Sequence, residues 1–126
     1  MMNTIYYTEQ TEFFGGRRPH ELIAEFGSPL YVYNETILRA RCREMAKLVS
    51  LPVFKVNYSC KANSNISLLS IIREEGLDAD AMSPGEIYLL RAAGFSPKRI
   101  FYVGNNVAAS EIQTVVAQGI MISVDS

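Results

Sequence analysis

Residues 54–61 read FKVNYSCK, and this stretch decides the fold. Its β-branched and aromatic residues favour a strand, in which successive side chains point to opposite faces. The apolar face would carry Phe54, Val56, Tyr58 and Cys60 and would meet the helices. The polar face would carry Lys55, Asn57, Ser59 and Lys61.

Lys61 ends this expected strand just before the helix-starting run Ala62-Asn63-Ser64-Asn65. Parallel α/β proteins keep their chemistry where strands end, and a lysine amine held there is a candidate nucleophile for a Schiff base. The alternative is a solvated strand end whose lysine simply reaches water. The residues of this stretch alone leave both interpretations open.

The strand pattern recurs along the chain, in short runs at residues 53–60, 77–82, 100–104 and 120–125. The helical patterns between these runs end at Gly76, Gly94 and Gly119, and glycine readily adopts the left-handed conformation that ends a helix. Strand starts recur about every 21 to 25 residues, which is the rhythm of βα units. The repeat predicts a parallel sheet with its helices on one side.

Helix starts are also readable. Residues 83–86 (SPGE) have the pattern of a capping box, followed by an inward stripe of Ile87, Leu90 and Ala93. Asn34 can cap a longer helix, whose buried face would carry Leu38, Cys42, Met45 and Val49. Upstream, Pro19 would open a short helix closed by Gly27, after a turn at residues 13–16 and an extended N-terminal segment.

Four strands are too few for a closed barrel, which typically needs eight strands and about 250 residues. We therefore expect an α/β fold that forms the N-terminal part of a (β/α)8 TIM barrel, with about four βα units. Residues 1–28 would be an N-terminal extension with a short helix, and residues 29–126 the first half of the barrel. The alternative is a complete flavodoxin-like domain.

Composition excludes several classes of function. The formal charge is −1, with 12 basic and 13 acidic residues, so nucleic acid is not an expected partner. No apolar stretch approaches the roughly 20 residues that span a bilayer, and the first residues lack the pattern of a signal peptide. Cys42 and Cys60 fall in different elements, which favours buried thiols in the cytoplasm.

The stretch at residues 58–65 (YSCKANSN) resembles the cofactor-lysine motif of the pyridoxal-phosphate decarboxylases built on an alanine-racemase-like barrel. Within that superfamily the diaminopimelate decarboxylases are the most similar. Flanking segments extend the resemblance in the same order, namely residues 27–33 (GSPLYVY), 80–86 (DAMSPGE), 92–95 (AAGF), 103–106 (VGNN) and 124–126 (VDS). It covers nearly the whole chain but only about the first third of a family member.

The resemblance implies roles for individual residues. Lys61 would be the catalytic lysine that holds pyridoxal 5'-phosphate, and Asp80 would be the nearby acid that steadies its ammonium group once released. An ordinary loop partner for Asp80 and a purely capping role for Glu86 remain the alternatives. Supporting positions around the cofactor would be Ser59, Asn63, Glu86, Asn105 and Asp125. No metal ligand is expected.

The implied reaction of the full-length protein is decarboxylation of meso-diaminopimelate to L-lysine, in a homodimer. Decarboxylases acting on ornithine, arginine or carboxynorspermidine are the nearest alternatives, and a non-catalytic pyridoxal-phosphate-binding protein is another. The family's phosphate-binding segment, stacking histidine and partner-subunit cysteine would all lie beyond residue 126. We therefore expect the 126-residue chain alone to be inactive.

Overall fold

The computed structural model describes residues 13–124, and the chain divides into two compact units, residues 1–37 and 38–126. The predicted extended segment before residue 13 lies outside the described residues. The predicted domain boundary after residue 28 concerns the barrel and stays a prediction. Among the described residues, no helix is long and apolar enough to cross a membrane.

The first unit contains the expected turn at residues 13–16 and the helix α1 (Pro19–Phe26). Gly27 ends α1 with φ +86°, as the sequence predicts. Asn34 connects the two ends of this unit, because its side chain donates to the Phe13 carbonyl at 2.7 Å. Its Oδ1 accepts from the Ile37 amide at 3.0 Å, which confirms Asn34 as the cap of α2 (Glu35–Ala46).

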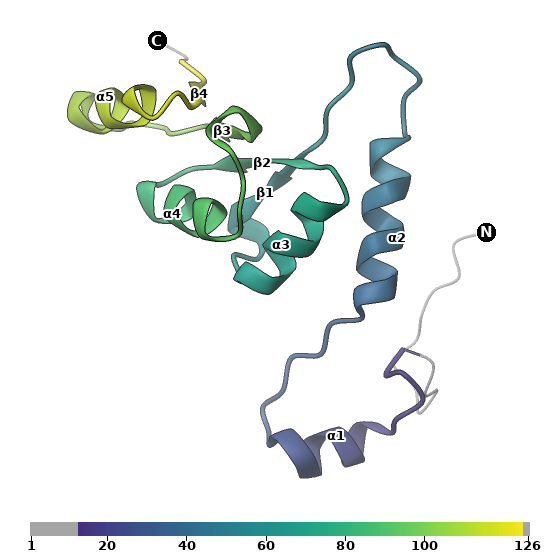
Figure 1. Ribbon diagram of the computed structural model, residues 1–126. Helices are drawn as coiled ribbons and strands as arrows, with labels where there is room; N and C mark the ends of the chain where they lie inside the picture. Colours follow the sequence, from purple (N-terminus) through teal and green to yellow (C-terminus); the bar gives the residue numbers. More distant parts are fainter. Residues whose placement is uncertain (1–12, 125–126) are drawn as a thin grey trace. The chain divides into compact units, whose positions relative to one another are not determined.

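The second unit is built around a parallel sheet of β1 (Asn57–Ser59), β2 (Asp78–Ala81), β3 (Ile100–Tyr102) and β4 (Met121–Ile122). The strands lie in the order β1-β2-β3-β4 (Figure 1). Between them run η1 (Cys60–Ala62), α3 (Ile66–Glu74), α4 (Pro84–Ala92), η2 (Pro97–Arg99) and α5 (Ala109–Ala117). A flavodoxin-like sheet would reverse its strand order, so the sequential order favours an arc of a barrel.

The helices pack on one face of this sheet. Alternate strand residues form the core with them, including Ala79, Ala81, Ile100 and Tyr102, together with Cys60 at the start of η1. The predicted stripe of α4 is confirmed, since Ile87, Leu90 and Ala93 are all buried in this core. The opposite face carries Asn57, Ser59, Asp80, Phe101 and Met121, which follow from the strand register.

The strands are shorter than predicted because β-branched and aromatic residues extend beyond the paired segments. Pairing of the first strand begins at Val56, whose carbonyl accepts from the Asp78 amide at 2.9 Å, whereas Val53 is 84% exposed. At the other end, β1 stops at Ser59 and the chain turns into η1. Lys61 therefore lies in a 3₁₀ turn after the strand and does not end the strand itself.

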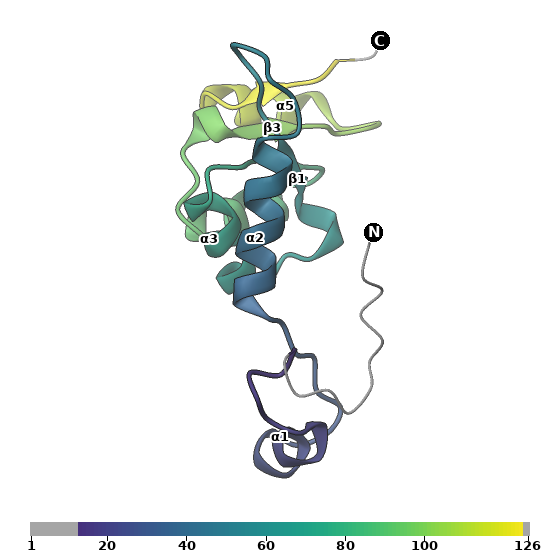
Figure 2. The ribbon, with the colours of Figure 1, turned by 90° about the vertical axis from the view of Figure 1, so that its right-hand side faces the viewer.

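Helix α2 contacts α3 through its middle residues (Figure 2). Leu38 and Cys42 pack with Ile72 and Leu77, while Arg39 forms ion pairs with Glu74 and Glu75 at 2.8 and 2.9 Å. The predicted buried stripe of this helix is wrong in its second half. The helix ends at Ala46, before Val49, and Met45 is 44% exposed.

Candidate active site

The carboxyl edge of the sheet presents Lys61 on a short turn. Its neighbour Cys60 is fully buried on the helix side, as expected from its place on the apolar face, while Lys61 is exposed. Burial, together with the nearby charges of Glu86 and Asp80, raises the pKa of the Cys60 thiol to about 11. The thiol is thus an inert core group, and the accessible nucleophile of the turn is the Lys61 amine.

Asp80 lies opposite Ser59 in the register of β1 and β2. The Ser59 hydroxyl donates to Asp80 Oδ1 at 2.9 Å, and both side chains are half-buried. This bond fixes the Asp80 carboxylate on the face of the sheet that points away from the helices. Asp80 lies on β2, next to the strand that leads to Lys61. The carboxylate therefore lies at the same edge of the sheet as Lys61.

Asn63 and Asn65 hold the turn that carries Lys61. The Tyr58 hydroxyl donates to the Asn63 carbonyl at 3.2 Å, so the residues on either side of the turn are linked. Asn63 Oδ1 accepts from the Asn65 amide at 3.0 Å, and Asn65 in turn caps α3 by accepting from Ser67 and Leu68. Asn63 is therefore a turn-forming residue beside the amine.

Glu86 forms the start of α4, with a small change from the predicted capping box. Ser83 Oγ accepts from the Glu86 amide at 3.2 Å, as expected. The Glu86 carboxylate, however, accepts from the Met82 amide at 2.7 Å, one residue before the cap. This contact accounts for Glu86 structurally, although its charge reaches as far as Cys60.

The two remaining expected residues are Asn105 and Asp125. Asn105 is exposed in the loop that follows β3, and Asp125 lies outside the described residues. The structure thus brings Ser59 and Asp80 into direct contact and places Lys61 and Glu86 after neighbouring strands. Within residues 13–124, no group of three His, Cys, Asp or Glu side chains could hold a metal ion.

One ionic cluster was missed by the sequence analysis. Asp78 is 7% exposed and pairs with Arg99 Nε at 2.8 Å and Lys55 Nζ at 3.0 Å, at the amino end of the strands. Arg99 also donates to the Leu77 carbonyl at 2.5 Å. Asp78 and Arg99 are 21 residues apart, as are Ser59 and Asp80. Searching for complementary side chains one βα repeat apart would have found both contacts.

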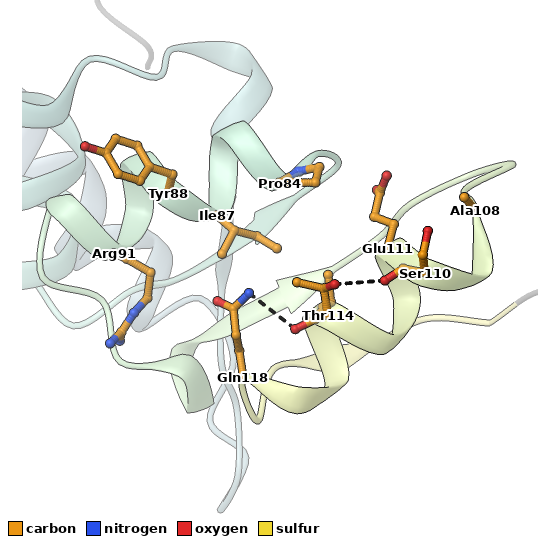
Figure 3. Close-up of a pocket in the computed structure, with 10 residues that line it drawn as sticks. Pro84, Ile87, Tyr88, Arg91, Ala108, Ser110, Glu111, Thr114 and Gln118 are labelled. Atoms are coloured by element: carbon orange, nitrogen blue, oxygen red, sulfur yellow. Dashed lines mark hydrogen bonds between the residues drawn. The ribbon is translucent and has the colours of Figure 1, made fainter.

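A hollow of about 480 Å³ lies between α4 and α5, on the helix side of the sheet (Figure 3). Its lining includes Ile87, Tyr88, Val115 and Gln118. The hydrogen bonds drawn there, from Thr114 to the Ser110 carbonyl and from Gln118 to the Thr114 carbonyl, stay within α5. Neither Lys61 nor Asp80 lines this hollow, so it is separate from the candidate site.

The residues at the carboxyl edge fit the lysine-linked end of a pyridoxal-phosphate site. An accessible amine stands on a held turn, next to the strand that carries a half-buried carboxylate. Covalent attachment of an aldehyde cofactor needs a nucleophilic amine, which Lys61 offers. Residues 13–124 thus supply the lysine-linked end of such a site.

Comparison with known proteins identifies the family. The model of the family described as "Pyridoxal-dependent decarboxylase, pyridoxal binding domain" matches residues 35–126. The chain belongs to this family. The pyridoxal-dependent decarboxylases include a diaminopimelate decarboxylase from Methanothermobacter thermautotrophicus that is 46% identical over 89% of this chain and 27% of its own length. The chain thus spans about a quarter of the curated relatives it matches.

Solved structures of similar proteins confirm the fold. A diaminopimelate decarboxylase from M. jannaschii in complex with L-lysine superposes with a TM-score of 0.76 at 30% identity, over 88% of this chain and 27% of that chain. A lysine/ornithine decarboxylase from Vibrio vulnificus shares the fold with a TM-score of 0.72 at 21% identity, over 85% of this chain and 29% of that chain. The expected first part of a barrel is therefore confirmed, and pyridoxal phosphate is the cofactor of the family.

Proposed function

We propose that this chain supplies the lysine-bearing first part of an enzyme that decarboxylates meso-diaminopimelate to L-lysine. The observation that carries the proposal is Lys61, an exposed amine on a held turn at the carboxyl edge of the sheet. Support for the substrate comes from relatives named diaminopimelate decarboxylase and from the L-lysine complex of the M. jannaschii enzyme. The net reaction releases carbon dioxide and places a proton on the carbon that lost it.

In this proposal Lys61 forms the covalent link to pyridoxal phosphate. When bound, the cofactor supplies the electron sink that lets the substrate carboxyl group leave as carbon dioxide. Asp80, oriented by the Ser59 hydroxyl, places a carboxylate at the same edge of the sheet as the Lys61 amine, which would carry the proton that the product carbon receives. Asn63 shapes the turn, and Glu86 holds the start of α4.

The test uses the full-length protein that contains this chain. After incubation with pyridoxal phosphate, borohydride reduction should fix the cofactor on Lys61, where peptide mass spectrometry locates it. Lys61→Ala should abolish both this adduct and release of carbon dioxide from meso-diaminopimelate. Lys98→Ala is the matched control, because Lys98 is an exposed lysine of η2. An adduct on another lysine, with Lys61→Ala still active, would refute the assignment.

A substrate panel separates the nearest alternatives. Ornithine, arginine and carboxynorspermidine decarboxylases would attach the cofactor to the same lysine but would prefer another amino acid. Cofactor attachment without release of carbon dioxide from any of these substrates would favour the non-catalytic alternative.

We further propose that the enzyme is a cytoplasmic homodimer without nucleic-acid or membrane partners. The two unpaired, buried cysteines Cys42 and Cys60 and the formal charge of −1 support this proposal. The dimer is inferred from the resemblance to the family. Size-exclusion chromatography with light scattering on the full-length protein would measure the oligomeric state.

A further inference from the structure

Helices α1, α4 and α5 carry a glutamate at their third position, and the glutamate of α5 has a different hydrogen-bond partner from the other two. Glu21 of α1 accepts from the Arg18 amide at 2.8 Å and Glu86 of α4 from the Met82 amide at 2.7 Å, so both satisfy backbone groups at their own helix start. Glu111 of α5 instead accepts from the Tyr102 hydroxyl. The N-cap of α5 is Ala108, which offers no side-chain cap. The start of α5 is therefore held by a side chain from β3.

Tyr102 is itself held rigidly. It is 1% exposed, its carbonyl accepts from the Ser123 amide at 2.9 Å, and the next residue, Val103, donates to the Ala81 carbonyl at 2.8 Å. Burial and the hydrogen bond to Glu111 raise the pKa of Tyr102 to about 12. The hydroxyl consequently keeps its proton, and remains a donor, throughout the physiological range.

The tyrosine ring also lies directly against the loop that follows β3. A methyl group at Gly104 would stand 2.4 Å from Tyr102 Cε1, so backbone and ring are in contact there. The loop of residues 103–108 is thus fixed near its start by the ring and at its end by the Glu111 contact. It carries the exposed Asn105. Because the strands are parallel, this loop leaves the sheet at the same edge as Lys61 and Asp80.

We infer that Tyr102 and Glu111 are positioning residues whose hydrogen bond fixes the loop of residues 103–108 and thereby holds the Asn105 amide at the edge where the amino-acid substrate binds. The inference rests on the proposed function for the substrate and on the structure for the loop. Neither Tyr102 nor Glu111 touches the reacting atoms. Each acts through the backbone that presents Asn105.

The loop part of the inference is tested by amide hydrogen exchange, without any substrate. Tyr102→Phe removes only the hydroxyl and keeps the ring against Gly104. Exchange of the amides of residues 103–108 should become about two- to tenfold faster, the effect of losing one net hydrogen bond. The single variant Glu111→Gln retains an acceptor oxygen for the Tyr102 hydroxyl and should keep most of the wild-type protection. Tyr88→Phe is the control, because Tyr88 is 72% exposed on α4. Unchanged exchange in Tyr102→Phe would overturn the inference.

The substrate part is tested by a double-mutant cycle in the full-length enzyme. Tyr102→Phe and Asn105→Ala should each raise KM for meso-diaminopimelate several-fold, with a smaller effect on kcat and with the borohydride-fixed adduct on Lys61 unchanged. The double variant should be no worse than Asn105→Ala alone, because both changes remove the same contact. Additive losses would overturn the link to Asn105. An inactive wild-type enzyme would refute the proposed substrate instead, and the exchange experiment would still decide whether the loop is held.

Discussion

Gly104 is the position where the structure makes the sharpest quantitative prediction. Six glycines have φ between +64° and +90°, whereas Gly85 and Gly104 do not. Space, and not backbone conformation, therefore requires glycine at position 104. A Cβ atom there would lie 2.4 Å from Cε1, 2.8 Å from Cζ and 2.8 Å from Oη of Tyr102. The ring cannot move aside, because its backbone is bonded to both neighbouring strands and its hydroxyl to Glu111.

The magnitude follows from two opposing effects of Gly104→Ala. Forcing an extra methyl group into a packed site costs about 1–3 kcal/mol. Restricting the unfolded chain by the same change gains about 0.4–1 kcal/mol. We expect a net loss of about 1–2 kcal/mol in the free energy of unfolding. Gly85→Ala is the matched control, since its Cβ would meet only Ser83 Oγ at 3.8 Å. That variant should gain about 0.4–1 kcal/mol.

The assay is urea unfolding followed by far-ultraviolet circular dichroism, because the chain has no tryptophan to report by fluorescence. In a Tyr102→Ala background, Gly104→Ala should cause no further loss in the free energy of unfolding. The coupling energy between the two substitutions should then be about 1–3 kcal/mol. A Gly104→Ala variant within about 0.5 kcal/mol of the wild type would refute the reasoning. So would a loss that persists undiminished without the ring.

Two further predictions concern the ion pairs of Asp78 and the pH dependence of stability. Arg99→Met should lower the free energy of unfolding by about 3 kcal/mol in urea titrations, because the buried Asp78 carboxylate loses its best partner. Lys55→Met should cost no more than about 1 kcal/mol, because the Lys55 side chain is 64% exposed. Equal losses in the two variants would contradict this ranking. Burial raises the pKa of Cys60 from 9.0 to about 11 and that of Tyr102 from 10.0 to about 12. The folded state keeps these protons longer than the unfolded state, so the free energy of unfolding should fall as pH rises from 9 through 12. The fall should be shallower in Tyr102→Phe than in the wild type, and identical slopes would count against the buried donor.

The number, direction and spacing of the strands were predictable because they depend on a repeated local pattern. Gly76, Gly94 and Gly119 each end a helix with a positive φ, and each was recognised from its place in the repeat. The strand ends were not predictable, since pairing depends on neighbours that the local sequence does not contain. Val53 has the right residue type for a strand but no partner strand, and it is 84% exposed.

In the candidate site too, some features were predictable from the local sequence and others were not. The placement of Lys61 and Asp80 at one edge was predictable, because each lies at or just after the end of a strand and strand ends share one edge in a parallel sheet. The 3₁₀ turn under Lys61 was not foreseen, because it depends on a hydroxyl of Tyr58 reaching the carbonyl of Asn63. The Tyr102–Glu111 contact joins a strand to a helix start, whereas Glu86 of the preceding repeat bonds to a backbone amide. A repeat pattern does not predict a contact in which neighbouring repeats differ.

Cys60 and Lys61 sit side by side in the chain yet in different surroundings, one wholly inside the core and the other open to solvent. Shifting the Lys61 backbone would require moving the buried Cys60 thiol out of its packed site. The Lys61 backbone is therefore anchored, while its four-carbon side chain is exposed to solvent. Such a short, anchored arm gives the amine a high effective concentration within its reach. An amine detached from a bound aldehyde would remain next to it, and its return would be an intramolecular event independent of protein concentration. In the proposed enzyme, the buried Cys60 would thus limit how far the Lys61 backbone can move.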